Sequence, residues 1–254
     1  MRSSGEPEEF CMEIEAQDVA VEVGGASVLP ATGVLVAAGR RALVAVDAGH
    51  DGQAPVALAL ALTGRLLPTR GRLLVSGHDV GLWGRDELRR RTAVVDVPGV
   101  TDPEPALPLR AAVAEELRAA GRPASRGDAR AWLDDLGLAD VADVPARDLP
   151  PATRTRALAE LAAARPAVEA LVLARPDRGG GDAREAGGWW DLAGELAGRG
   201  LAVAVLVARA EAAVVEGAGL LRPGDLRAAS GVPRAERPDD LPPRPTELSV
   251  EATL

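Results

Sequence analysis

The sequence predicts an α/β protein in which helices cover both faces of a parallel sheet. Three short, continuously apolar runs support this prediction, because strands buried on both faces of a sheet lose the alternation of half-exposed strands. These runs lie at residues 42–46, 170–174 and 201–207. Segments with helical spacing lie between the runs, as expected for parallel strands joined by crossovers. With 254 residues, 47% of them apolar, the chain can fill such a core.

The N-terminal part is predicted to add an antiparallel β subdomain. Residues 13–23 alternate between apolar and polar side chains and end at Gly24-Gly25, which indicates a half-exposed strand entering a hairpin. Residues 55–62 are predicted to form a helix with Pro55 in its first turn, where the missing N–H is tolerated. Further β segments are expected at 72–75 and 92–96.

A helical insertion is expected at about residues 98–154. Leu109, Val113 and Leu117 recur at helical spacing, and a second helical segment with Trp132, Leu133 and Leu136 follows Ser125. Helices are then expected near 152–165 and 183–198. We interpret Trp189-Trp190 in the last of these as helix packing, with contact to a partner as the alternative.

Composition excludes several classes of function. The chain has 29 basic and 38 acidic residues and a net charge of −9, so it lacks the basic surface that nucleic acids attract. It contains no Lys, no Asn and two His, which excludes Schiff-base chemistry, a phosphate-loop lysine and a His-rich metal site. Its single cysteine, Cys11, excludes an internal disulfide.

The two ends are expected to lie outside the folded domain. Residues 1–12 are predicted to be an N-terminal tail, and residues 223–254, rich in Pro, Arg and acidic residues, a disordered C-terminal tail. The first residues are acidic and lack the pattern of an export signal, and the apolar runs are about half the length of a membrane span. We therefore predict a cytoplasmic protein.

A series of short motifs follows the first buried strand. Strand, glycine-containing loop and helix form the layout of a phosphate-binding loop. The loop and first helical turn contain Gly49, His50, Asp51, Gly52, Gln53, Ala54, Pro55, Val56 and Ala57. Further landmarks are Leu66–Gly71, Ser76–Val80, Leu88–Arg91, Leu149–Arg154 and Ala174–Pro176.

In order and spacing, residues 13–222 resemble the nucleotide-binding subunit of ATP-binding cassette (ABC) transporters, whose core is of the P-loop NTPase type. The resemblance places residues 49–57 at the P-loop and Ala174-Arg175-Pro176 at the Walker B Asp-Glu-Pro. Arg209 falls at the switch histidine, and the usual glutamine falls near Val97. The segment at the family's signature motif consists of Leu149, Pro150, Pro151, Ala152 and Thr153.

At these positions the chain lacks the family's catalytic chemistry. Pro55 and Val56 stand in place of the phosphate-binding Lys and the magnesium-binding Ser, and Ala174 and Arg175 in place of the Walker B Asp and the Glu that orients water. We expect no catalytic residues, no ATP hydrolysis, weak or absent ATP binding, no magnesium or other metal site and no required cofactor. Arg175 and Arg209 are either anion contacts or partners of carboxylates such as Asp177 and Asp182.

The resemblance implies a membrane permease as partner, contacted through the insertion and the segment Val97–Leu109. It also implies a cassette dimer and a position at the inner face of the cell membrane. The predicted function is an ABC-type subunit, defective in hydrolysis, that acts as a structural or regulatory partner of the permease. The alternative is an anion- or nucleotide-binding sensor that uses the residual P-loop without turnover. An unrelated Rossmann-like enzyme would need a dinucleotide fingerprint, which the sequence lacks.

Overall fold

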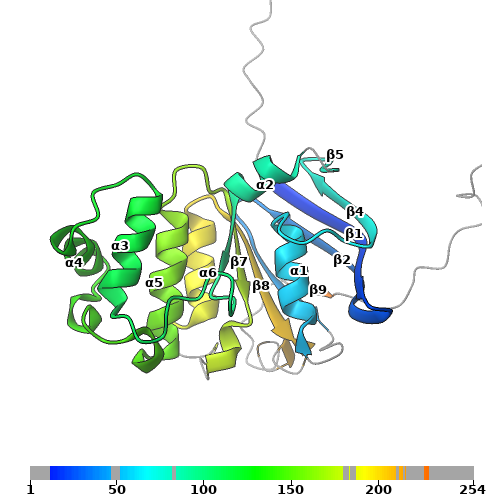
Figure 1. Ribbon diagram of the computed structural model, residues 1–254. Helices are drawn as coiled ribbons and strands as arrows, with labels where there is room; N and C mark the ends of the chain where they lie inside the picture. Colours follow the sequence, from blue (N-terminus) through cyan, green and yellow to red (C-terminus); the bar gives the residue numbers. More distant parts are fainter. Residues whose placement is uncertain are drawn as a thin grey trace, which may run out of the picture.

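The structure, a computed structural model, contains a parallel sheet with an antiparallel sheet packed beside it and helices on both faces of the parallel sheet (Figure 1). The α/β fold class expected from the sequence is confirmed. The structure describes residues 12–46, 52–81, 84–179, 183, 187–209, 212–213, 215 and 226–228.

The antiparallel sheet has the strand order β2-β1-β4-β5. Its strands are β1 (Glu13–Val23), β2 (Ala26–Ala37), β4 (Arg70–Val75) and β5 (His78–Asp79). The turn between β1 and β2 is Gly24-Gly25, and both glycines have positive φ, +58° and +83°. Two-residue hairpin turns of type I′ require this conformation, which glycine adopts without a steric penalty. The hairpin expected at the start of the chain is therefore present.

The parallel sheet has the order β6-β7-β8-β3-β9. Its strands are β3 (Arg41–Val46), β6 (Thr92–Val95), β7 (Ala170–Ala174), β8 (Ala202–Ala208) and β9 (Leu226–Ala228). β3, β6, β7 and β8 are almost wholly buried, which explains why their sequences are continuously apolar.

Strand β9 lies in the segment that we expected to be a tail. Leu226 pairs with Leu43 and Ala228 with Ala45, so the expectation is wrong for these three residues. Without β9, β3 would be an edge strand on this side. Pairing with β9 gives hydrogen-bond partners to N–H and C=O groups of β3, which are costly to bury without partners. A three-residue strand in a Pro- and Arg-rich stretch has too little apolar pattern to be recognised.

The helices divide between the two faces of the parallel sheet. Helix α1 (Ala54–Leu62) shares one core with Val44 and with the antiparallel sheet. Helices α5 (Pro151–Ala163) and α6 (Trp189–Gly198) share the opposite core with Leu43. Because successive side chains of a strand point to opposite faces, neighbouring residues of β3 belong to different cores.

The segment between β6 and β7 contains the helices α3 (Leu109–Ala119) and α4 (Arg126–Asp135), as expected from the helical spacing. Ser125 is the N-cap of α4, and its hydroxyl accepts a hydrogen bond from Asp128 N at 3.2 Å. The Asp128 carboxylate accepts a reciprocal bond from Ser125 N at 2.8 Å, and the hydrogen bonds to Ser125 lower the pKa of Asp128. The short helix α2 (Arg85–Arg91), which precedes β6, was not expected.

Helix α6 begins at Trp189 rather than near residue 183, with Gly188 as its N-cap. Trp189 and Trp190 are buried, and their rings meet edge to face with centroids 6.2 Å apart, which confirms the packing interpretation. Arg41, at the start of β3, places its guanidinium carbon 4.1 Å from the centroid of the Trp190 ring. Its Nη1 donates a hydrogen bond to the Trp190 carbonyl at 2.6 Å. Through these two contacts with Trp190, Arg41 links the start of α6 to strand β3.

Candidate functional site

The residues singled out by the sequence motifs gather at the carboxyl edge of the parallel sheet. The last residue of β3, Val46, pairs with Ala208, and Ala174 at the end of β7 pairs with Leu206. The segments that carry the expected loop, Arg175 and Arg209 therefore leave neighbouring strands at one edge. In open α/β sheets, ligands bind in the crevice outside this edge.

The expected phosphate loop leads into helix α1. Residues 49–51, which include Gly49, His50 and Asp51, lie outside the described residues. Gly52 has a φ of +70°, and Gln53 is the N-cap of α1 without a side-chain cap bond. Pro55 lies buried in the first turn and removes one of the N–H donors that a helix N-terminus normally offers.

The side chains of this first turn provide no polar group for a ligand. Ala54 and Ala57 are buried, Val56 is half-buried, and the first turn contains no acidic residue. The Ala57 N–H is used within the helix, because it bonds to the Gln53 carbonyl at 2.9 Å. The described part of the loop is therefore shaped like a helix start but carries neither a charge nor a hydroxyl there.

Arg175 directly follows β7 and forms an ion pair with Asp177. Its Nε lies 3.1 Å from both carboxylate oxygens of Asp177, and its Nη2 lies 3.0 Å from Oδ2. The backbone at Arg175 has a φ of +57°, and its N–H bonds to Leu206 O at 2.9 Å, which ties this turn to β8. Pairing with a local carboxylate, the alternative to anion contact, is therefore what the structure contains at Arg175. Arg209, just beyond β8, is exposed.

A second group of charges, not expected from the sequence, surrounds Asp96 at the end of β6. The Asp96 carboxylate accepts hydrogen bonds from Arg154 of α5, with Nε at 3.2 Å from Oδ1. Arg178 of the 3₁₀ turn η4 (Pro176–Gly179) donates to the Asp96 carbonyl at 3.2 Å. The side chains of Asp96 and Arg154 are only 20% and 21% exposed. The only sequence signal was a charged residue that ends a buried strand.

The signature-like segment forms the start of α5. Leu149 is buried, Pro150 is the N-cap, and Pro151 is the first helical residue. Neither proline has an N–H group, so this helix start lacks two donors that could face a ligand. Ala152 and Thr153 are half-buried in the first turn. The segment is therefore compatible with the start of a helix, but it offers few hydrogen-bond donors to a ligand.

Two further ion pairs hold α5 to its neighbour α6. Arg156 donates to both carboxylate oxygens of Glu195 at 2.9 and 3.1 Å, and this pairing lowers the pKa of Glu195. Near the other end of α5, Arg199 donates to Glu160 at 2.8 Å. These contacts fix the direction in which α5 leaves the carboxyl edge.

The described residues contain no cluster of three or more His, Cys, Asp or Glu side chains that could hold a metal ion. Within the same residues, no helix is long and apolar enough to cross a membrane. At the carboxyl edge, the carboxylates of Asp96 and Asp177 are each paired with an arginine, Arg154 and Arg175 respectively.

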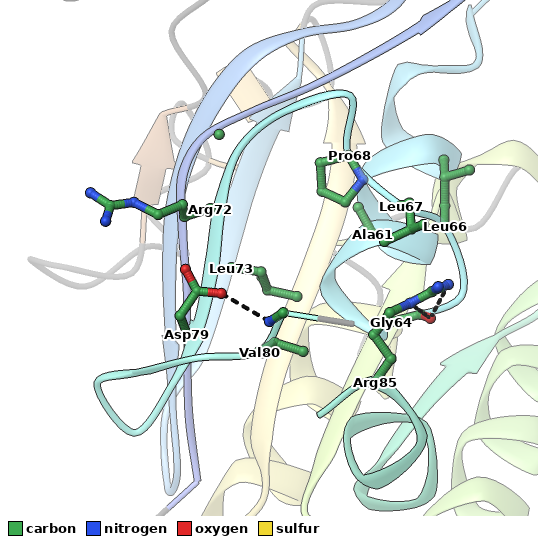
Figure 2. A pocket seen from close by; sticks show the side chains of 12 residues that line it. Ala61, Gly64, Leu66, Leu67, Pro68, Arg72, Leu73, Asp79, Val80 and Arg85 are labelled. Carbon is green, nitrogen blue, oxygen red and sulfur yellow. Dashed lines mark hydrogen bonds between the residues drawn. The ribbon is translucent and has the colours of Figure 1, made fainter. Parts of the chain in front are cut away.

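A pocket of about 300 Å³ lies at the opposite end of α1 from the loop (Figure 2). Its walls include Leu66, Pro68 and Leu73. The Arg85 guanidinium bonds to the carbonyl of Gly64 at 3.1 Å, and Asp79 accepts a bond from the N–H of Gly81 at 2.9 Å. Because the nine residues of α1 separate its two ends by about 14 Å, this pocket is distinct from the carboxyl edge.

Comparison with solved structures identifies the class of fold. An ATP-binding subunit of an ABC transporter matches with a TM-score of 0.54 and 16% identity over 80% of this chain and 82% of that chain. A nucleotide-free ATP-binding cassette of an ABC transporter matches with a TM-score of 0.54 and 18% identity over 81% of this chain and 84% of that chain. A bacterial Atm1-family ABC exporter with ATP bound matches with a TM-score of 0.52 and 15% identity over 78% of this chain and 35% of that chain.

The protein therefore has the fold of an ATP-binding cassette, and the resemblance found in the sequence is confirmed at the level of the fold. No protein-family model matches the sequence, and no curated protein does. At identities of 15–18%, the likeness lies in the path of the chain rather than in its side chains.

Proposed function

We propose that the protein is an ATP-binding-cassette-type subunit that does not hydrolyse ATP and acts as a structural or regulatory partner of a membrane permease. The fold supports the cassette part of this proposal. The observation that carries the loss of hydrolysis is the first turn of α1, where Pro55 and Val56 occupy the positions that the family's motif gives to Lys and Ser. A P-loop NTPase needs that Lys on the phosphates and that hydroxyl on Mg²⁺.

The end of β7 supports the same conclusion. Ala174 offers no carboxylate for a magnesium ion, and Arg175 is a cation paired with Asp177 rather than an acid that could orient water. Each lost charge-assisted hydrogen bond removes about 1.5–3 kcal/mol. Losing three or four of them lowers nucleotide affinity by several orders of magnitude.

The proposed permease contact uses the segment Val97–Leu109 and the insertion with α3 and α4. Val100 in this segment is a large apolar side chain that is 50% exposed. Connecting segments carry binding residues more often than the elements they join, and Val100 gives this segment an apolar side chain for such a contact. A second cassette subunit is the other proposed partner, and the inner face of the cell membrane is the proposed location.

Calorimetric titration of the full chain with Mg-ATP, Mg-ADP and inorganic phosphate tests the loss of nucleotide chemistry. We expect no saturable binding at millimolar concentrations and no phosphate release above buffer. The double variant Pro55→Lys with Val56→Ser restores the missing charge and hydroxyl, and we expect it to bind Mg-ATP more tightly than the natural chain. Micromolar binding of Mg-ATP to the natural chain would contradict the proposal, and micromolar binding of phosphate would favour the sensor.

Affinity capture from detergent-solubilised membranes tests the partner. We expect the tagged chain to recover a polytopic membrane protein, and Val100→Glu to reduce that recovery. Val23→Glu is the matched control, because Val23 is 63% exposed at the far end of β1, outside the proposed contact. Equal loss with both variants, or recovery that neither changes, would count against the proposed segment.

A further inference from the structure

A cavity of about 360 Å³ lies away from the carboxyl edge, where the ends of three elements meet. Helix α4 contributes Trp132 and its C-cap residue Leu136, and the end of α5 contributes Ala163 and the C-cap residue Ala164. The remaining lining residues are Glu160, Arg199 and Leu201. This volume falls in the range of small-molecule sites, of about 300–1,000 Å³.

Glu160 is the unusual member of this lining. As a whole residue it is 8% exposed, and its side chain is 10% exposed, close to the 8% of the Asp177 side chain at the carboxyl edge. Its Oε2 accepts a hydrogen bond from Arg199 Nη2 at 2.8 Å. The described part of the chain provides no other hydrogen bond to this carboxylate. Because a buried carboxylate normally accepts several hydrogen bonds, Glu160 retains acceptor capacity at the cavity.

Arg199 is the hydrogen-bond partner of Glu160, and Arg156 interacts with Glu160 through its charge. The Arg199 side chain is 51% exposed, so its guanidinium is largely hydrated. An ion pair with one exposed partner contributes little to stability, because water competes for the cation. A second cation with apolar surroundings can therefore share or take over the carboxylate at low cost.

The other walls suit the body of an organic cation. The half-buried indole of Trp132 provides a π face that attracts positive charge, and Leu136, Ala163 and Leu201 provide aliphatic contacts. A carboxylate or phosphate ligand would be repelled by Glu160, and the one cation in the lining, Arg199, already bonds to that carboxylate. The pocket at the end of α1 differs, because Asp79 and Arg85 there both bond to the backbone beside them.

We propose that this cavity binds a small organic cation, an ammonium or guanidinium group on a compact apolar body, with its N–H groups on Glu160 and its body against Trp132 and Leu136. The proposal does not depend on the function proposed above. It requires no nucleotide and no second subunit.

The test is a calorimetric titration of the full chain with n-butylguanidinium and n-butylammonium in an amine-free phosphate buffer. n-Butanol and n-butyrate are the neutral and anionic analogues of matched size. We expect saturable one-to-one binding of at least one of the two cations, and no saturable binding of the alcohol or the carboxylate. Absence of saturable binding by both cations, or equal binding of butyrate, would overturn the proposal.

Three variants separate ligand binding from a structural role. Glu160→Gln is expected to weaken cation binding about tenfold or more, the loss of one charge-assisted hydrogen bond. Arg199→Gln is expected to strengthen it several-fold, because it removes the competing guanidinium. Glu22→Gln, on the antiparallel sheet and paired with Arg70, is the matched control and should leave binding unchanged. Weakening by both Glu160→Gln and Arg199→Gln would show that the pair is structural and would overturn the proposal.

Two further measurements keep the test decisive. If Glu160→Gln does not fold, as judged by circular dichroism, Ala163→Phe fills the cavity instead and is expected to abolish binding. The peptide N-acetyl-Gly-Arg-Gly-amide carries the same guanidinium on a polypeptide. Tighter binding of n-butylguanidinium than of this peptide supports a free cation, whereas tighter binding of the peptide overturns it in favour of a protein side chain.

Discussion

Replacing Gly194 by alanine is expected to destabilise this protein, although the same change stabilises most helices. Gly194 lies inside α6, where alanine exceeds glycine in helix propensity by about 0.5–1 kcal/mol. A Cβ atom added at Gly194 would lie 2.8 Å from Nη1 of Arg41 and 3.3 Å from its Cζ. The guanidinium of Arg41 would have to move away from the carbonyl and the indole ring of Trp190, with which it interacts.

The cost follows from the two contacts that Arg41 would lose. Its hydrogen bond to the Trp190 carbonyl is 2.6 Å long, and its Cζ lies 4.1 Å from the centroid of the indole ring. A hydrogen bond from a charged donor contributes about 1.5–3 kcal/mol, and a cation–π contact contributes about 0.5–2 kcal/mol. After subtraction of the gain in helix propensity, Gly194→Ala should lower the free energy of unfolding by about 1–4 kcal/mol.

Urea denaturation of four proteins provides the assay: the natural chain, Gly194→Ala, Arg41→Met and the double variant. Methionine keeps an unbranched apolar side chain at position 41 but removes the guanidinium. Gly194→Ala should lower the urea midpoint in the natural background and raise it in the Arg41→Met background, with the slope m unchanged. If the alanine stabilises both backgrounds equally, Arg41 does not hold the start of α6 and the reasoning is refuted.

Three other changes test separate parts of the fold. Arg154→Met removes a guanidinium from Asp96 and should lower the free energy of unfolding by about 1–3 kcal/mol, with faster amide exchange in the first turn of α5; unchanged exchange there would contradict the role assigned to this pair. Ser125→Ala removes the N-cap of α4 and should cost about 1 kcal/mol in urea denaturation, whereas an unchanged midpoint would show that the cap is dispensable. The hydrogen bond from Arg110 lowers the pKa of Asp143, so the stability from this pair is complete above the unfolded-state pKa of about 3.9 and is lost as the pH falls through the folded-state pKa. Asp143→Asn should therefore flatten the acid limb of stability below about pH 4, and an unaltered limb would argue against the pair.

The sequence predicted the parts of the fold in which burial dictates the pattern. Strands β3, β7 and β8 are buried on both faces, and their runs of Ala, Val and Leu reveal this directly. Helix α2 was missed because Leu88 is its one buried residue, which gives no apolar period to detect. Strand β9 was missed because its three residues depend on a distant partner, β3, rather than on their own pattern.

The candidate site was predicted in its position but only partly in its contacts. The motifs located Arg175 at the end of a buried strand, and the pairing with Asp177 was one of two open alternatives. The contacts of Asp96 with Arg154 and Arg178 could not be predicted, because they join residues 58 and 82 positions apart. Such contacts depend on how α5 and η4 are placed over the sheet, which local sequence does not determine.

The strand order also constrains when the protein can finish folding as it is synthesised. β3 is flanked by β8 and β9, and Arg41 pairs with Val203, about 160 positions later in the chain. Until the ribosome has released that later segment, both edges of β3 lack their native neighbours. Nascent chains that stall before residue 202 would leave the apolar strand β3 unpaired and prone to aggregation. Both strands that cover β3, namely β8 and β9, lie about 160 or more positions later in the sequence.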